Sequence, residues 1–153
     1  MKTYALSRSD GGVTITRASD SADILKVISK WEALTGAVTA GGPLKGVTIV
    51  AHREIAGAAI PPDRTFRDAL KPDLTHDMSK CREIHKNKLR ELRAPKFAAL
   101  DIEHLRADEA ANTTLKQQIA AKKQALRDVT ADPRIAAAQT PEELKAVIPV
   151  VLT

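Results

Sequence analysis

Two short segments near the start of the chain, residues 3–8 and 13–17, combine apolar and polar residues in β-prone runs. Residues 9–12 between them contain Asp-Gly and Gly-Gly pairs, which supply the positive φ angles of tight hairpin turns. Apolar residues then recur at helical spacing over residues 24–34. After a Gly-Gly-Pro turn, the β-branched run of residues 46–52 favours another strand. The pattern predicts a β-β-α-β unit.

Prolines mark the end of this unit. Pro61 and Pro62 are adjacent, and Pro72 repeats the signal. Each proline removes an amide donor and restricts the residue before it to extended backbone. Residues 61–76 are therefore predicted to form a proline-stiffened connector on the surface.

The chain beyond residue 77 has the hydrophobic period of helices, with bases on the opposite face. We predict that Pro95 kinks or ends the first helix and that a second helix begins at Asn112 or Thr113. These two helices are expected to pack as an antiparallel hairpin. A threonine followed by proline and two glutamates, residues 140–143, predicts a short last helix.

The predicted fold class is α+β, with a small α/β domain over residues 1–60, the connector over 61–76 and a basic α-helical region over 77–153. Hydrophobic residues make up 43% of the 153 residues but aromatic residues only 3%, so alanine and aliphatic side chains must form the core. Cys81 is the only cysteine, which excludes an internal disulfide. No run approaches the roughly 18 apolar residues of a membrane span, and we expect neither a span nor a signal segment.

The positive charge is concentrated in one stretch. Residues 79–96 hold seven bases against two acids, a net of +5 that equals the net charge of the whole chain. Such a stretch could neutralise the phosphates of nucleic acid. Glu83 and Glu91 interrupt it, and few aromatic residues are present to stack on bases, so we favour a solvated face or a surface for an acidic protein. The basic-surface candidates are Lys80, Arg82, Lys86, Lys88, Arg90, Arg93 and Lys96.

Side chains that could carry chemistry are sparse. His76, Cys81 and His85 form one cluster with metal-ligand character, because positions 81 and 85 are one helical turn apart. The interpretation that we favour is a buried cysteine with two partly exposed histidines. No nucleophile elbow, phosphate loop, dinucleotide motif or isolated carboxylate pair is present. We expect no catalytic residues, no metal and no cofactor.

The connector contains a different candidate, an aromatic ring between two arginines. Arg64, Phe66 and Arg67 follow the stiff Pro61-Pro62 entry, and arginine and aromatic residues are enriched at the energetic centres of interfaces. We predict a protein interface at these three residues. The alternative is that Phe66 fills the gap between the two halves of the chain while nearby aspartates pair with the arginines.

Five segments in consistent order carry a family resemblance. They read PDRTFR (62–67), DMSKCREIH (77–85), RAPKFAALD (93–101), KKQALRDV (122–129) and TPEELK (140–145). Together they resemble a family of small proteins encoded in the tail gene clusters of tailed bacteriophages and prophages. The Leu126-Arg127-Asp128 stretch is also similar to one in phage tail assembly chaperones. None of these motifs has known chemistry. The resemblance therefore implies a place among phage tail genes more than a mechanism.

The resemblance implies a non-enzymatic tail protein that binds other phage tail proteins or a second copy of itself. The first hypothesis is a virion component, made in the bacterial cytoplasm, that acts as an adaptor at the tail tip, baseplate or fibre attachment. The second is a tail assembly chaperone that is absent from the mature virion. The third is a nucleic-acid-binding protein that uses the basic residues of the stretch 80–96.

Overall fold

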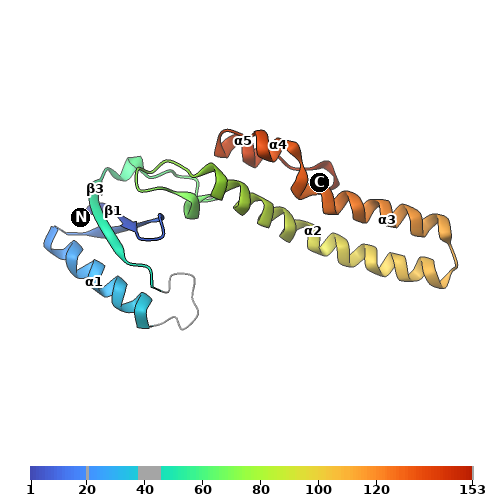
Figure 1. Ribbon diagram of the computed structural model, residues 1–153, viewed down its shortest axis with the longest axis horizontal. Coiled ribbons are helices and arrows are strands. Elements are labelled where there is room, and N and C mark those ends of the chain that lie inside the picture. Colours follow the sequence, from blue (N-terminus) through green and yellow to red (C-terminus); the bar gives the residue numbers. More distant parts are fainter. Residues whose placement is uncertain (20, 38–45, 153) are drawn as a thin grey trace. The chain divides into compact units, whose positions relative to one another are not determined.

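The computed structural model describes residues 1–19, 21–37 and 46–152 (Figure 1). The chain divides into two compact units, Met1–Asp77 and Met78–Thr153. The first contains a sheet with one helix and the second is helical, so the predicted α+β class is confirmed. The predicted Gly-Gly-Pro turn lies outside the described residues.

The first unit is built on a three-stranded antiparallel sheet with the strand order β2-β1-β3. The predicted hairpin is confirmed as β1 (Lys2–Arg8) and β2 (Val13–Ala18), joined by a turn in which Gly11 has a φ of 76°. Strand β3 (Ile49–Ile55) begins later than the sequence predicted. Gly46 has a φ of 74°, a left-handed conformation that does not fit a strand, which accounts for the later start.

Helix α1 (Ser21–Ala37) packs against one face of this sheet. Alternation along β1 places Tyr4 and Leu6 on that face, where they form a core with Ala18 and Ile24. The helical period of the sequence therefore correctly located the helix, and Ile24, Val27 and Ile28 of its apolar stripe pack on the sheet.

The other face of the sheet carries Ala5 and Ile55, which are also buried. Arg53 lies on this face, because it pairs with Ala5 across the strands, and its guanidinium donates to the carbonyl of Pro72 at 2.8 and 3.2 Å. The chain after β3 is therefore attached to the sheet. It forms two short 3-10 helices, η1 (Gly57–Ala59) and η2 (Arg67–Ala69).

The segment 61–76, predicted as a connector, thus packs as part of the first unit. Phe66, Ala69 and Leu70 are buried, and the amide of Asp77 donates to the carbonyl of Ala69 at 2.8 Å. Prolines correctly indicated irregular backbone here. They gave no information on burial, which depends on contacts with residues distant in sequence.

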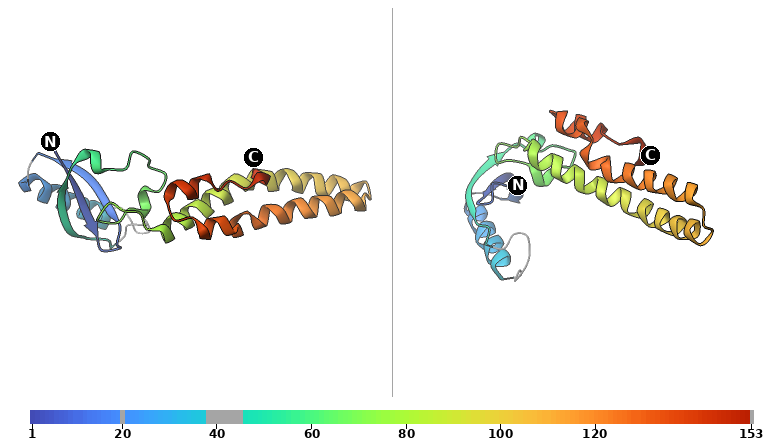
Figure 2. Two further views of the ribbon diagram at one scale, coloured as in Figure 1. Left: turned by 90° about the horizontal axis from the view of Figure 1, so that it is seen from above. Right: turned by 45° about the vertical axis from the view of Figure 1, so that its right-hand side comes forward.

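The second unit is a helical hairpin of α2 (Met78–Glu109) and α3 (Thr113–Asp128), which lie side by side in every view (Figure 2). Asn112 caps α3 as predicted, accepting a hydrogen bond from the amide of Leu115 at 2.9 Å. Of the two effects predicted for Pro95, a kink or an end of the helix, the end is wrong, since α2 continues through Pro95. Pro95 is exposed, so water can bind the carbonyl that its missing N–H leaves unpaired, and packing against α3 stabilises both sides.

Three short elements complete this unit after α3: η3 (Val129–Ala131), α4 (Pro133–Ala137) and α5 (Pro141–Ala146), before a final turn η4 (Val150–Leu152). Thr140 caps α5 as predicted, but Glu143 accepts from the amide of Gln139 instead of the cap amide. Helix α4 was not predicted, although Asp132 before Pro133 is a capping signal. Ile135 and Leu144 anchor α4 and α5 by burial.

Candidate functional site

Three of the seven basic candidates donate to backbone carbonyls within the second unit. Arg82 reaches the carbonyls of Ile135 (3.2 Å) and Ala138 (2.9 Å) at the end of α4. Arg93 bonds two carbonyls at the end of α3, those of Leu126 and Arg127, both at 3.0 Å. Lys96 donates to the carbonyl of Val151 in η4 at 3.2 Å.

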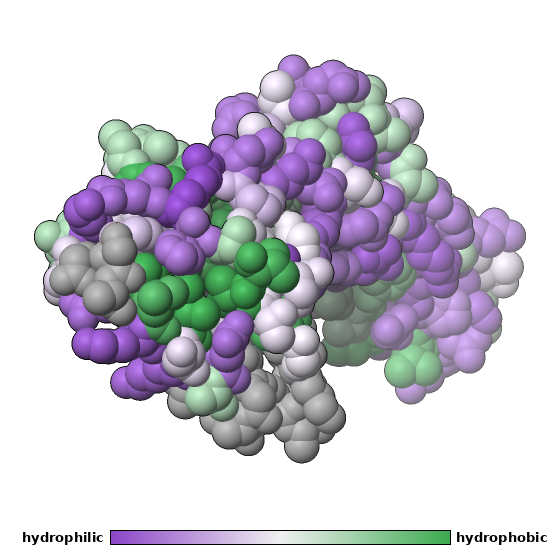
Figure 3. Space-filling view, turned by 60° about the vertical axis from the view of Figure 1, so that its left-hand side comes forward, coloured by the Kyte–Doolittle hydropathy of each residue, from purple (hydrophilic) through white to green (hydrophobic). Residues whose placement is uncertain are grey.

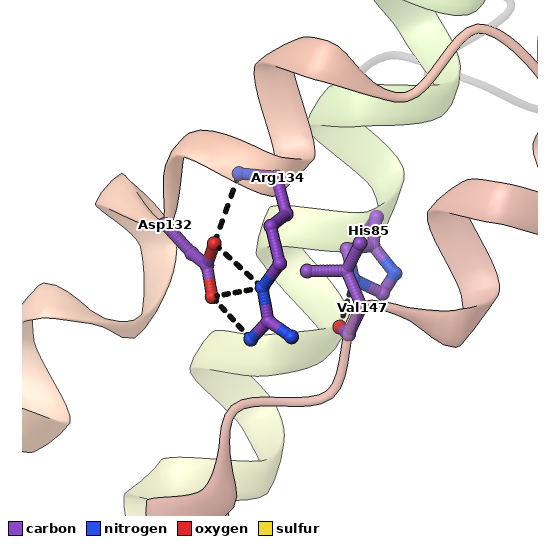
Figure 4. Close-up of polar contacts among 4 residues, drawn as sticks. All are labelled: His85, Asp132, Arg134 and Val147. Atoms are coloured by element: carbon purple, nitrogen blue, oxygen red, sulfur yellow. Dashed lines mark hydrogen bonds and ion pairs between the residues drawn. The ribbon is translucent and has the colours of Figure 1, made fainter.

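His85 extends this set of contacts. Its Nε2 lies 2.9 Å from the carbonyl of Val147, the residue that ends α5 (Figure 4). Because a carbonyl oxygen only accepts hydrogen bonds, this nitrogen carries the proton. We call Arg82, His85, Arg93 and Lys96 the carbonyl-binding row.

The row has a simple electrostatic cause. The last carbonyls of a helix have no partner within the helix and carry partial negative charge, which favours nearby cations and N–H donors. The row satisfies such carbonyls at the ends of α3, α4 and α5. Positions 82, 85, 93 and 96 share one side of α2 with the buried Cys81 and Leu89. That shared side was the sequence signal that could have revealed their role.

The other basic candidates lie on the surface of α2. Lys86 pairs with Glu83 at 2.9 Å, and this hydrogen bond lowers the pKa of the Glu83 carboxyl. Arg90 bonds the side chain of Asn87. Lys80 and Lys88 are exposed. The seven bases therefore do not form one uniform cationic face.

The aromatic ring nearest this stretch is also engaged. The guanidinium carbons of Arg93 and Arg127 lie 5.7 and 5.9 Å from the ring centre of Phe97, within the range of cation–π contacts. This arrangement leaves the partly buried Phe97 ring poorly placed to stack on a nucleic-acid base.

The His76, Cys81 and His85 cluster does not assemble as ligands. Cys81 and His85 are both buried, which corrects the expectation of a partly exposed His85, and the carbonyl of Val147 holds the His85 ring. Within residues 1–19, 21–37 and 46–152, no group of three His, Cys, Asp or Glu side chains is placed to hold a metal ion.

The first unit contains an open cleft of about 710 Å³. One wall is strand β2, of which residues 13–17 all line the cleft, and the other is formed by residues 60–64 with Arg67 and Asp68. Four arginines border the cleft against two aspartates: the bases are Arg8, Arg17, Arg64 and Arg67, and the acids are Asp63 and Asp68. We call it the arginine cleft.

The three interface candidates have different places in this cleft. Arg64 and Arg67 line it and are exposed, with Arg67 3.6 Å from Asp68. Phe66 is only 2% exposed and does not line the cleft. Its ring is therefore a buried packing group, and the exposed interface candidates are the two arginines.

Apolar side chains are exposed on α2 as well. Ile102 and Leu105 are 52% and 63% exposed and lie one turn apart. Hydrophilic residues otherwise predominate on the visible surface of the helical unit, whereas the visible face of the first unit has a contiguous hydrophobic area (Figure 3). The part of the chain that the structure describes contains no helix with the length and apolarity to cross a membrane.

The ionisable groups with shifted pKa values are explained by local hydrogen bonds. Arg134 forms an ion pair with Asp132 at 2.7 Å, and this hydrogen bonding lowers the pKa of the Asp132 carboxyl and raises that of the guanidinium (Figure 4). Thr75 and Lys116 lower the pKa values of Asp73 and Asp108 in the same way. In these three aspartates the shift favours the charged carboxylate.

Comparison with known proteins adds no assignment: no protein-family model matches the chain, and neither a similar characterised protein nor a similar solved structure is found.

Proposed function

We propose that the protein is a non-enzymatic bacteriophage tail protein, a virion component that joins two neighbouring proteins at the tail tip, baseplate or fibre attachment. The proposal starts from the five sequence segments that resemble small tail-cluster proteins. Two structural features support an adaptor: the chain forms two compact units, and each unit has its own exposed surface suited to protein contact.

The observation that carries the proposal is the chemical difference between these surfaces. The first unit offers a cleft bordered by arginines, and the second offers the exposed apolar pair Ile102 and Leu105. Arginine is enriched at interfaces, and exposed apolar side chains stabilise complexes by their burial. Two unlike surfaces fit two different partners better than they fit one.

The nucleic-acid alternative has less support. Arg82, Arg93 and Lys96 are bound to carbonyls, so fewer cations of the basic stretch can displace counterions from phosphates. Weak affinity for any duplex or single strand at ~50 mM salt is expected. Tight binding that falls steeply with added salt would favour this alternative over the tail adaptor.

Mass spectrometry of purified virions tests the proposal. The phage or prophage that encodes the chain is propagated, and its particles are purified by gradient centrifugation. An adaptor is present in a fixed ratio to the other tail proteins. Complete absence from the particle, together with abundance in the infected cell, would contradict the proposal and indicate an assembly chaperone.

A further inference from the structure

We propose that the arginine cleft binds an extended, acidic segment of a partner protein, which adds as a fourth strand to the outer edge of β2. This inference rests on the proposed function for the partner's origin, a neighbouring tail protein. It specifies the chemistry by which that partner is recognised.

The backbone of β2 has hydrogen-bonding groups on its outer side. This strand lies at an edge of the sheet, and within the described residues no backbone hydrogen bond joins it to a segment other than β1 and the turn. The Arg8 amide donates to the Gly12 carbonyl at 2.9 Å, so Arg8 and Gly12 form a hydrogen-bonded pair at the end of the β1–β2 ladder. Hydrogen-bonded and non-hydrogen-bonded pairs alternate along an antiparallel ladder. The odd-numbered residues Val13, Ile15 and Arg17 therefore direct their amides and carbonyls away from β1. Such an edge is a template for strand addition.

The outer edge of β2 opens into the arginine cleft. Five consecutive residues, 13–17, line it, which requires exposure of the strand edge as well as of one face. At about 3.3 Å per residue, this edge matches an extended segment of about five residues. Val13, Ile15 and Ile60 provide apolar contacts for alternate side chains of that segment.

The arginine cleft has an excess of positive charge. Arg17 and Arg64 line the cleft, and within the described chain neither guanidinium has a hydrogen bond or ion pair to another residue. Arg67 is 62% exposed despite its neighbour Asp68. Arg8 is already neutralised by Asp10, with two contacts at 3.0 Å. The remaining arginines outnumber the aspartates of the cleft, so carboxylates on the incoming strand are favoured.

The same surface does not equally favour a second copy of this chain. Pairing two β2 edges would bring Arg17 of each copy toward the other arginines of the cleft, and like charges at close range are unfavourable. An acidic strand meets no such repulsion. We therefore assign the cleft to a different protein.

The test uses the full-length protein and a fluorescein-labelled octapeptide of alternating glutamate and valine, with binding followed by fluorescence anisotropy at ~50 mM salt. Two control peptides have the same length: one replaces glutamate by lysine, and the other is N-methylated at alternate residues to block strand pairing. We expect the acidic peptide to bind, and both controls to bind at least about tenfold more weakly. Failure of the acidic peptide to bind, or equal binding of either control, would overturn the proposal.

Two variants locate the site. Ile15→Pro removes an outward amide without removing a bond to β1, and should weaken binding about tenfold or more. Arg64→Glu with Arg67→Glu tests the charge at exposed positions where folding is retained, and should have a similar effect. Unchanged affinity of the double variant would contradict the assignment. The assignment would also be contradicted if the protein alone, without peptide, dimerises and Ile15→Pro abolishes that dimerisation.

The outcome is separable from that of the virion experiment. Presence in virions without binding of the acidic peptide would overturn strand addition and leave the adaptor proposal standing. Peptide binding by a protein that is absent from virions would overturn the virion adaptor and leave the cleft assignment standing.

Discussion

The exposed arginines of the arginine cleft and the cations of the carbonyl-binding row use their positive charge in opposite ways. In the first unit, Arg17 and Arg64 border an open cleft, and neither guanidinium bonds to another described residue. In the second, Arg82 and Arg93 are bonded to carbonyls at helix ends. The difference follows from the backbone nearby: helix C-termini present unpaired carbonyls, whereas the cleft is bordered by a strand edge with both donors and acceptors. A cation's role is therefore set by its neighbouring backbone more than by the charge of its segment.

The largest expected effect on stability concerns Phe66, which is a packing group, whereas its neighbours Arg64 and Arg67 are interface candidates. Because the ring is buried, Phe66→Ala should lower the free energy of unfolding by about 3 to 5 kcal/mol. The matched control is Phe97→Ala in the second unit, whose ring is partly exposed and should cost less. Urea denaturation followed by circular dichroism measures both. A smaller loss for Phe66 than for Phe97 would show that Phe66 is not a packing group.

Next in size is the carbonyl-binding row. Arg82→Ala leaves the carbonyls of Ile135 and Ala138 without their charged donor, and hydrogen bonds to charged groups contribute about 1.5 to 3 kcal/mol. Lys88→Ala, on the exposed side of the same helix, serves as the control and should change stability by less than about 0.5 kcal/mol. Equal effects of the two substitutions would remove the distinction between the row and the surface bases.

A moderate effect is expected at the start of α4. Asp132→Ala removes the side chain that accepts from the amide of Arg134 at 2.9 Å, and loss of such a cap costs about 1 kcal/mol. The pKa of Asp132 is lower in the folded state, so the charged carboxylate stabilises the fold above its ordinary value of 3.8, and this contribution is lost as pH falls through the folded value.

The comparison variant for this cap is Asp132→Asn, which keeps an acceptor but has no charge. Thermal denaturation between pH 7 and pH 3 should show a gap between wild type and Asp132→Asn that narrows at the acid end. A gap that widens with acid would contradict the assignment of the lowered pKa to the Arg134 contact.

The smallest effect is expected for an exposed ion pair of the second unit. Lys86→Ala removes the contact with Glu83, whose side chain is 60% exposed, and water should compensate for the loss. The melting temperature should stay nearly unchanged. A drop comparable to that of Arg82→Ala would mean that surface pairs, and not only carbonyl contacts, hold the second unit together.

Much of the fold could be predicted because its signals are local. Asp10 and Gly11 specified the hairpin turn, Asn112 the start of α3, and Thr140 the start of α5. Each of these residues acts within a few positions of its own place in the chain, so both partners of the interaction lie in one short segment.

The candidate site could be predicted only in part, because its interactions span long stretches of chain. Arg82 and Ala138 are 56 positions apart, and nothing near Arg82 indicates which carbonyl it bonds. Phe66 illustrates the same limit, since a proline-rich neighbourhood does not reveal a buried ring. The arginine cleft brings residues 13–17 beside 60–64, and only the tertiary structure shows that pairing.

One matched pair of triple variants tests the central contrast most directly. The first replaces Arg17, Arg64 and Arg67 of the cleft with glutamine, and the second replaces Arg82, Arg93 and Lys96 of the row with glutamine. Unfolding free energy and incorporation into virions are measured for both. We predict that the cleft variant keeps its stability but is lost from particles, whereas the row variant is markedly destabilised. A destabilised cleft variant that accompanies a stable row variant would contradict the account.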